Sequence, residues 1–144
     1  MNFFKDGKWK CITIDKYLPV NNQNKLIFAK CENENEFWVP LAEKAFAKLH
    51  GSYSQLIGGH THEALVDLTG GVGYQIKIKS NMYNSIELWE KLNKCNEDEY
   101  LMGASISSNT TNESEFKGTG LLTGHAYGLL KCVEINKIKL IHLR

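Results

Sequence analysis

The residue best placed to do chemistry is a histidine in the segment GLLTGHAYGLL, which spans residues 120–130. His125 follows Gly124, whose missing side chain leaves the backbone open to close approach. A strand after the histidine would hold its ring rigidly, which suits a general base at a cleft edge. The neighbours are nearly all apolar, which is typical instead of a core histidine with satisfied hydrogen bonds. Neither a nucleophile nor an orienting group is adjacent in sequence, so spacing alone favours the core histidine.

The other four histidines carry weaker signals. His60 and His62 form an H-x-H pair, which on a strand would project two possible metal ligands to one side. No third ligand has suitable spacing, and Thr61 is expected to cap a helix, so a metal site is not favoured. His50 stands at a predicted helix end, where we expect it to interact with terminal carbonyl groups. His142 lies in the predicted final strand and is expected to be structural or exposed at an edge.

Composition excludes several classes of function. The chain has 144 residues, 42% hydrophobic and 23% charged, with a net charge of +1, which suits one ordinary globular domain. Basic and acidic residues are interspersed, so no nucleic-acid partner is expected. No apolar run approaches the ~20 residues of a membrane span, and the first residues lack a signal-peptide pattern, so a cytoplasmic location is expected. The four cysteines form no C-x-x-C pair and are interpreted as free thiols.

Three helices are expected. Apolar residues spaced four apart predict the longest over residues 35–51, with Asn35 as its cap and Gly51 as its end. Pro40 lacks an amide donor and is expected to disturb the first turn. Similar signals predict two shorter helices, over residues 61–71 with Thr61 as cap and over residues 85–93 with Ser85 as cap.

Strand patterns dominate the second half of the chain. The segment 125–135 is apolar on both faces and is therefore predicted to be a central strand, joined by a turn at Asn136 to the final strand. A helix-rich first half and a strand-rich second half predict an α+β fold. Further strands are predicted at residues 11–15, 25–30, 72–79 and 100–107.

Several motifs taken together resemble the catalytic core of the calpain family of cysteine proteases. NEFWVPLAEKAFAKLHGSYSQLIGGHTHEALVDLTGG, residues 35–71, is similar to a family pattern that runs from Phe-Trp through E-K-A-[YF]-A-K and G-G to D-x-T-G-G. GLLTGHAYGL is similar to the family's catalytic-histidine segment. DKYLP at 15–19 and KLIHLR at 139–144 resemble two further family segments. Their order fits the family along the whole chain.

The resemblance implies a papain-like fold of two lobes and calcium-dependent cleavage of proteins inside the cell. Residues from about 1 to 59 would be the end of the first, helix-containing lobe, and residues from about 60 to 144 the antiparallel second lobe. His125 would be the catalytic histidine, which pairs with a cysteine thiolate. Gly59 and Gly124 would hold an extended protein or peptide substrate through their backbone groups. Glu36 would supply one carboxylate to a Ca²⁺ ion of the first lobe.

The resemblance also predicts what these residues lack. The family's nucleophile lies in a segment like Q-G-x-x-G-D-C-W, which this sequence does not contain, and N-P-W-G with the catalytic asparagine would follow Arg144. We therefore expect a fragment of the catalytic domain that is inactive alone and that needs the missing part of the catalytic core as partner. The alternatives are a catalytically inactive calpain-like binding or regulatory module, and a structural domain without cleft function.

Overall fold

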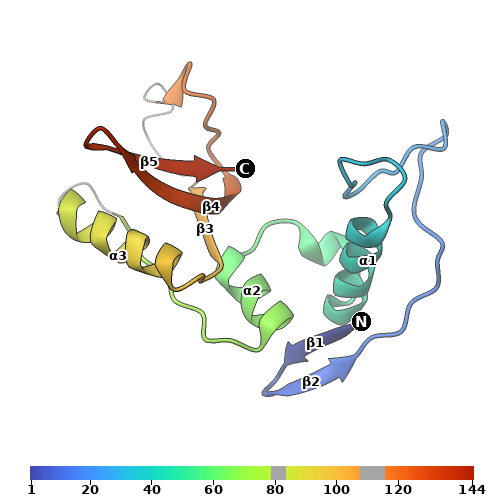
Figure 1. Cartoon of the computed structure of the whole chain (residues 1–144). Helices are drawn as coiled ribbons and strands as arrows, with labels where there is room; N and C mark the ends of the chain where they lie inside the picture. Colours follow the sequence, from blue (N-terminus) through green and yellow to red (C-terminus); the bar gives the residue numbers. More distant parts are fainter. Residues whose placement is uncertain (79–83, 108–115) are drawn as a thin grey trace. The chain divides into compact units, whose positions relative to one another are not determined.

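The computed structural model describes residues 1–78, 84–107 and 116–144 and contains helices and antiparallel sheets, in agreement with the predicted α+β class (Figure 1). Contacts divide the chain into two compact units, Met1–Val72 and Gly73–Arg144, and each is described by itself. No helix within the described ranges is long and apolar enough to cross a membrane. This division by contacts does not test the predicted boundary between the two lobes near residue 59, which stays a prediction.

The first unit begins with a hairpin that the sequence patterns did not predict. Strands β1 (Asn2–Lys5) and β2 (Lys8–Cys11) pair antiparallel through a turn at Asp6 and Gly7. These two residues have φ values of 53° and 74°, the left-handed conformation that Asp-Gly adopts readily in tight hairpins. Three helical elements follow, namely α1 (Trp38–His50), the 3-10 helix η1 (Tyr53–Leu56) and α2 (Thr61–Thr69).

Phe3 of β1 is the centre of the small core of this unit. Its side chain is fully buried, and its ring centroid lies 5.7 Å from that of Phe46 on α1. Ala45 and Ala47 of the same helix are also buried. Burial of one such aromatic side chain contributes about 1.5–3 kcal/mol, so Phe3 fastens the hairpin to α1.

Helix α1 begins later than predicted, because Phe37 and not Asn35 is its cap residue. The first amide with a helical acceptor is that of Leu41, which donates to the Phe37 carbonyl at 3.1 Å. Pro40 therefore stands among the first residues of the helix, whose amides have no helical acceptor in any case, and its ring is tolerated there. Gly51 ends the helix as predicted, with a φ of 110° that disfavours other residues.

The strands predicted at 11–15 and 25–30 are wrong, since β2 ends at Cys11 and the second segment forms only an isolated bridge. Side chains of α1 form hydrogen bonds with backbone groups of both segments that a partner strand would otherwise bind. Glu43 Oε2 accepts a hydrogen bond from the Ala29 amide at 2.8 Å, and Lys48 Nζ donates to a carbonyl of the first segment at 2.7 Å. An apolar run becomes a strand only where another strand satisfies its backbone groups, and here a helix satisfies part of them.

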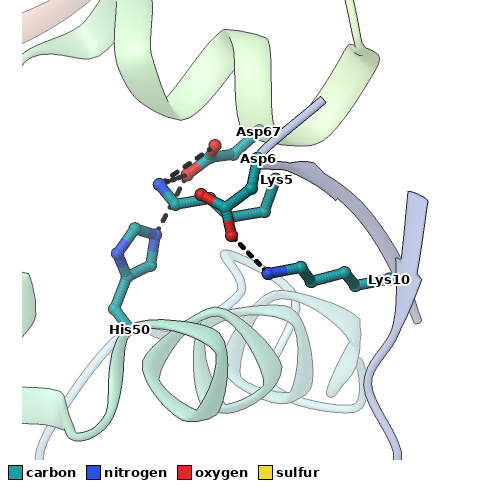
Figure 2. A network of polar contacts seen from close by, with 5 residues as sticks. All are labelled: Lys5, Asp6, Lys10, His50 and Asp67. Carbon is teal, nitrogen blue, oxygen red and sulfur yellow. Dashed lines mark hydrogen bonds and ion pairs between the residues drawn. The ribbon is translucent and has the colours of Figure 1, made fainter. Parts of the chain in front are cut away.

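A buried carboxylate joins three elements of the first unit (Figure 2). Asp67 of α2 is only 6% exposed. Lys5 Nζ of β1 lies 2.9 Å from Asp67 Oδ2, and Nε2 of His50 at the end of α1 lies 3.0 Å from the same oxygen. The expectation that His50 would interact with helix carbonyls is therefore corrected to a contact with Asp67. Removal of either basic group would leave a buried charge less well compensated.

Helix α2 ends in a compact turn built by Thr69, Gly70 and Gly71. Thr69 Oγ1 donates to the Leu65 carbonyl at 2.7 Å and accepts from the Gly71 amide at 3.1 Å. Gly70 has a φ of 71°, and a Cβ there would lie 3.1 Å from the Trp9 ring. The predicted end of this helix is confirmed, whereas its cap residue is His60 and not Thr61.

The described residues of the second unit form one helix and one three-stranded antiparallel sheet. Its elements are α3 (Ser85–Glu97), β3 (Met102–Ile106), β4 (His125–Ile135) and β5 (Ile138–Leu143), with strand order β3-β4-β5. The predicted central position of the strand 125–135 is confirmed. Asn136 and Lys137 have φ values of 51° and 66° in the turn between β4 and β5, which confirms the predicted hairpin.

Helix α3 packs on β4, where Leu129 and Cys132 are buried. Asn96 Oδ1 of the helix accepts a hydrogen bond from the Cys132 amide at 2.9 Å, which ties the helix to the central strand. The helix cap is Asn84 and not Ser85, because Asn84 Oδ1 accepts from the Ile86 amide.

The strand predicted at 72–79 does not form in its described part, 72–78, and residue 79 lies outside the described residues. Val72 is 99% exposed. Tyr74 contacts α3 through its side chain, since its hydroxyl accepts from Lys91 Nζ at 2.7 Å. Alternation of apolar and polar residues was therefore not sufficient to make a strand here.

We expect Asp67→Asn to lower the free energy of unfolding of the first unit by about 1–3 kcal/mol, because Lys5 and His50 would lose their anionic partner. Asp6→Asn is the matched control, since the ion pair of Asp6 with Lys10 is exposed to solvent and should contribute little to stability. Urea unfolding followed through amide NMR signals of the first unit measures both. Equal losses in the two variants would contradict a special role of the buried carboxylate.

Candidate active site

His125 is the first residue of β4 and is held by backbone pairing on one side. It stands opposite Ile106 of β3, and the Gly124 amide donates to the Ile106 carbonyl at 2.8 Å. Gly124 has a φ of 66°, so the chain turns sharply just before the histidine. The side chain of His125 is exposed. The interpretation as a core histidine is therefore wrong, and the imidazole is accessible at the start of a central strand.

Tyr127 contacts the imidazole and was not singled out from the sequence. The two ring centroids lie 4.8 Å apart, and the ring planes are inclined by 77° in a T-shaped arrangement. The Tyr127 hydroxyl accepts a hydrogen bond from the Leu122 amide at 2.7 Å. The contact could have been predicted from the H-x-Y spacing, because side chains two residues apart on a strand project to the same face of the sheet.

Glu36 lies in the loop just before α1 and has an exposed side chain. Its Oε1 accepts a hydrogen bond from Asn33 Nδ2 at 3.1 Å, and its amide donates to the Asn33 carbonyl at 3.0 Å. Within residues 1–78, 84–107 and 116–144, no group of three or more His, Cys, Asp or Glu residues is arranged to hold a metal ion. The described residues thus do not build a complete calcium site around Glu36.

The two glycines predicted to bind substrate both have left-handed backbones. Gly59 has a φ of 117° and follows Gly58, which has a φ of 80°. Gly59 and Gly124 are both exposed, and no atom lies within 4 Å of a Cβ built at Gly59. Gly124 is the direct neighbour of His125 in the second unit, whereas Gly59 belongs to the first unit with Glu36. An added side chain would strain the backbone at either position.

The remaining histidines do not build a second site in the described part of the chain. The rings of His60 and His62 stack with centroids 5.5 Å apart, but no third ligand completes a metal-binding group there. His142 is exposed on β5, which is an edge strand of the described sheet, in agreement with its expected place.

All four cysteines have free thiols. Cys132 is buried in the middle of β4, and burial raises the pKa of its thiol, with a smaller contribution from Cys95. The thiolate is the nucleophilic form of cysteine, so a raised pKa makes Cys132 a poor nucleophile. Cys11 is exposed at the end of β2, and Cys31 and Cys95 are half-buried.

The chain is similar to known proteins along its whole length. The family described as "Calpain family cysteine protease" matches residues 1–144. The calpain-type cysteine protease DEK1 of Zea mays is 37% identical over 148 residues, which cover 100% of this chain and 7% of that protein. Calpain-12 of Homo sapiens is 41% identical over 143 residues, which cover 96% of the chain and 19% of that protein. Calpain-5 of Mus musculus is 38% identical over 147 residues, which cover 98% and 22% respectively. The chain thus spans less than a quarter of the length of these relatives.

We expect Cys132 to be alkylated by iodoacetamide more slowly than Cys11 at mildly alkaline pH. Burial limits access to the Cys132 thiol and raises its pKa, so less of it is thiolate at a given pH. Peptide mass spectrometry after timed labelling measures each site. Labelling in urea is the control, and there the two rates should converge; equal rates in the folded chain would show that Cys132 is not protected.

Proposed function

The chain belongs to the calpain family of cysteine proteases, and from that premise we propose that it supplies the catalytic histidine of a calpain-type endopeptidase, His125. The observation that carries the proposal is the exposed imidazole of His125 at the start of the central strand, directly after the left-handed Gly124. A general base must be accessible to its nucleophile and held in a fixed orientation.

In the proposed reaction, the imidazole of His125 takes the proton of a cysteine thiol, and the thiolate attacks the carbonyl carbon of the scissile peptide bond. The imidazolium then returns the proton to the leaving amine. Cys132 is a poor candidate for this cysteine because it is buried with a raised pKa. We assign the nucleophile and the orienting asparagine to parts of the protease other than residues 1–144.

We propose that the catalytic domain has a papain-like fold of two lobes and that its substrate is a protein or peptide bound in extended form. Gly59 and Gly124 would each present backbone groups to it, and their left-handed φ values of 117° and 66° support a role for glycine at both positions. Peptide binding through main-chain groups leaves room for limited sequence preference.

The calpain family is generally regulated by calcium. We propose Glu36 as one carboxylate ligand, since its side chain is exposed and bonded to Asn33 by a single side-chain contact. The described residues do not complete such a site, so its other ligands would come from elsewhere in the protease. The free thiols of all four cysteines support a reducing, cytoplasmic location.

We expect the chain of residues 1–144 to show no hydrolysis of a fluorogenic peptide, with or without calcium. The reason is that its cysteines lack the setting of a protease nucleophile, and Cys132 in particular is buried. Fluorescence release over several hours measures this, with an intact calpain as positive control. Turnover by the pure chain would overturn the assignment of the nucleophile to another part of the protease.

In the complete protease that carries this segment, we expect His125→Ala to lower kcat by about 10³-fold or more, because the thiol would lose its base. His142→Ala is the matched control: it removes the same ring from an exposed position on β5 and should retain activity. Activity of the His125→Ala variant near that of the control would contradict the proposal. A complete protease without any activity would favour the alternative, an inactive binding or regulatory module.

A further inference from the structure

We propose that Tyr127 is a positioning residue that fixes the imidazole of His125 and the loop that precedes it. Its importance for catalysis rests on the proposed function of His125, whereas its effect on the orientation of the ring does not. The inference stands on two contacts within the second unit.

The first contact is between the two rings. His125 and Tyr127 are two residues apart on β4, so their side chains leave the same face of the sheet. Their centroids lie 4.8 Å apart at an inclination of 77°, which is an edge-to-face arrangement that aromatic rings prefer. An exposed imidazole without such a neighbour would sample several rotamers. The tyrosine ring restricts this choice.

The second contact fastens the tyrosine itself. The Leu122 amide donates to the Tyr127 hydroxyl at 2.7 Å, and Leu122 lies three residues before His125. The strand holds one end of the tyrosine side chain, and the loop holds the other. Tyr127 therefore bridges the chain segments on both sides of His125 and adds to the bond from the Gly124 amide to the Ile106 carbonyl.

The consequence for catalysis is geometric. A general base must hold one ring nitrogen within hydrogen-bond reach of the thiol, and small misplacements of a catalytic group lower the rate steeply. A tyrosine that contacts the ring and also ties down the preceding loop limits both rotation of the imidazole and movement of its backbone. Tyr127 acts through His125 and does not itself transfer a proton in this proposal.

The two contacts can be separated by NMR of the histidine ring protons in the chain of residues 1–144. In the wild-type chain we expect ring-current-shifted His125 signals and a single χ1 rotamer. Tyr127→Phe keeps the ring but loses the hydroxyl contact, so the ring-current shift should remain while the Leu122 amide signal moves. Tyr127→Leu removes both contacts, so we expect loss of the ring-current shift and averaging of χ1. His125→Gln assigns the signals.

Tyr100→Phe is the control, because Tyr100 lies in the same unit and its exposed ring loses the same hydroxyl atom. It should leave the His125 signals unchanged. The proposal is overturned if His125 gives the same signals in the wild-type chain and the Tyr127→Leu variant while other amide signals of the second unit show that the variant is folded.

Kinetics of the complete protease separate this inference from the proposed function. With His125 as the base, Tyr127→Leu should lower kcat by about 10- to 100-fold with little change in KM, and Tyr127→Phe should recover part of the loss. If His125→Ala abolishes activity while Tyr127→Leu leaves kcat unchanged, the positioning role is wrong. If His125→Ala retains activity while Tyr127→Leu still alters the His125 signals, the proposed function fails and the positioning role stands.

Discussion

The buried carboxylate of Asp67 is the interaction on which the arrangement of the first unit depends. Asp67 lies on α2, and its basic partners lie on β1 and at the end of α1. One side chain therefore connects three elements that are distant in sequence. Burying a charge is costly unless partners compensate it, and the net gain of such a cluster is small. Its effect is to specify the arrangement, because any packing that separates Asp67 from Lys5 and His50 leaves an uncompensated charge. The core around Phe3 supplies the apolar part of the stability.

The same carboxylate gives a physical meaning to a motif that carried the family resemblance. In DLTGG, Asp67 is the buried carboxylate, Thr69 forms a hydrogen bond within the last turn of α2, and Gly70 ends the helix in a left-handed conformation beside the Trp9 ring. These three residue types thus each meet a structural demand of the first unit. The motif therefore indicates the family through its architecture, whereas GHAY contains the histidine for which we propose a catalytic role.

Several elements could be predicted because their sequence signals are local, although the equally local Asp-Gly hairpin of β1 and β2 was missed. The central strand β4 and its turn at Asn136 were predictable because apolar residues on both faces and a left-handed turn residue act locally. The three helices were recognisable from their apolar spacing, although the residue that caps the N-terminus was predicted wrongly for each of them. The strand predicted at 25–30 was wrong because a distant side chain, Glu43, binds the Ala29 amide. The sequence of residues 25–30 does not show that a helix side chain, and not a partner strand, would bind its backbone amide.

His125, the proposed catalytic histidine, shows at the level of one residue how far sequence neighbours can mislead. Apolar neighbours in GLLTGHAYGLL suggested burial, but burial along β4 depends on the position within the sheet. His125 begins the strand and is exposed, whereas Leu129, four residues later, is buried at the point where β4 pairs with both β3 and β5. Among the leucines of this segment only Leu129 belongs to the core, whereas Leu122 and Leu130 are exposed, so apolar neighbours do not show that His125 is buried. What defines its environment is Tyr127, two residues away, whose ring lies at 4.8 Å. The period of a strand, and not the composition of the window around it, was the information that could have placed this imidazole.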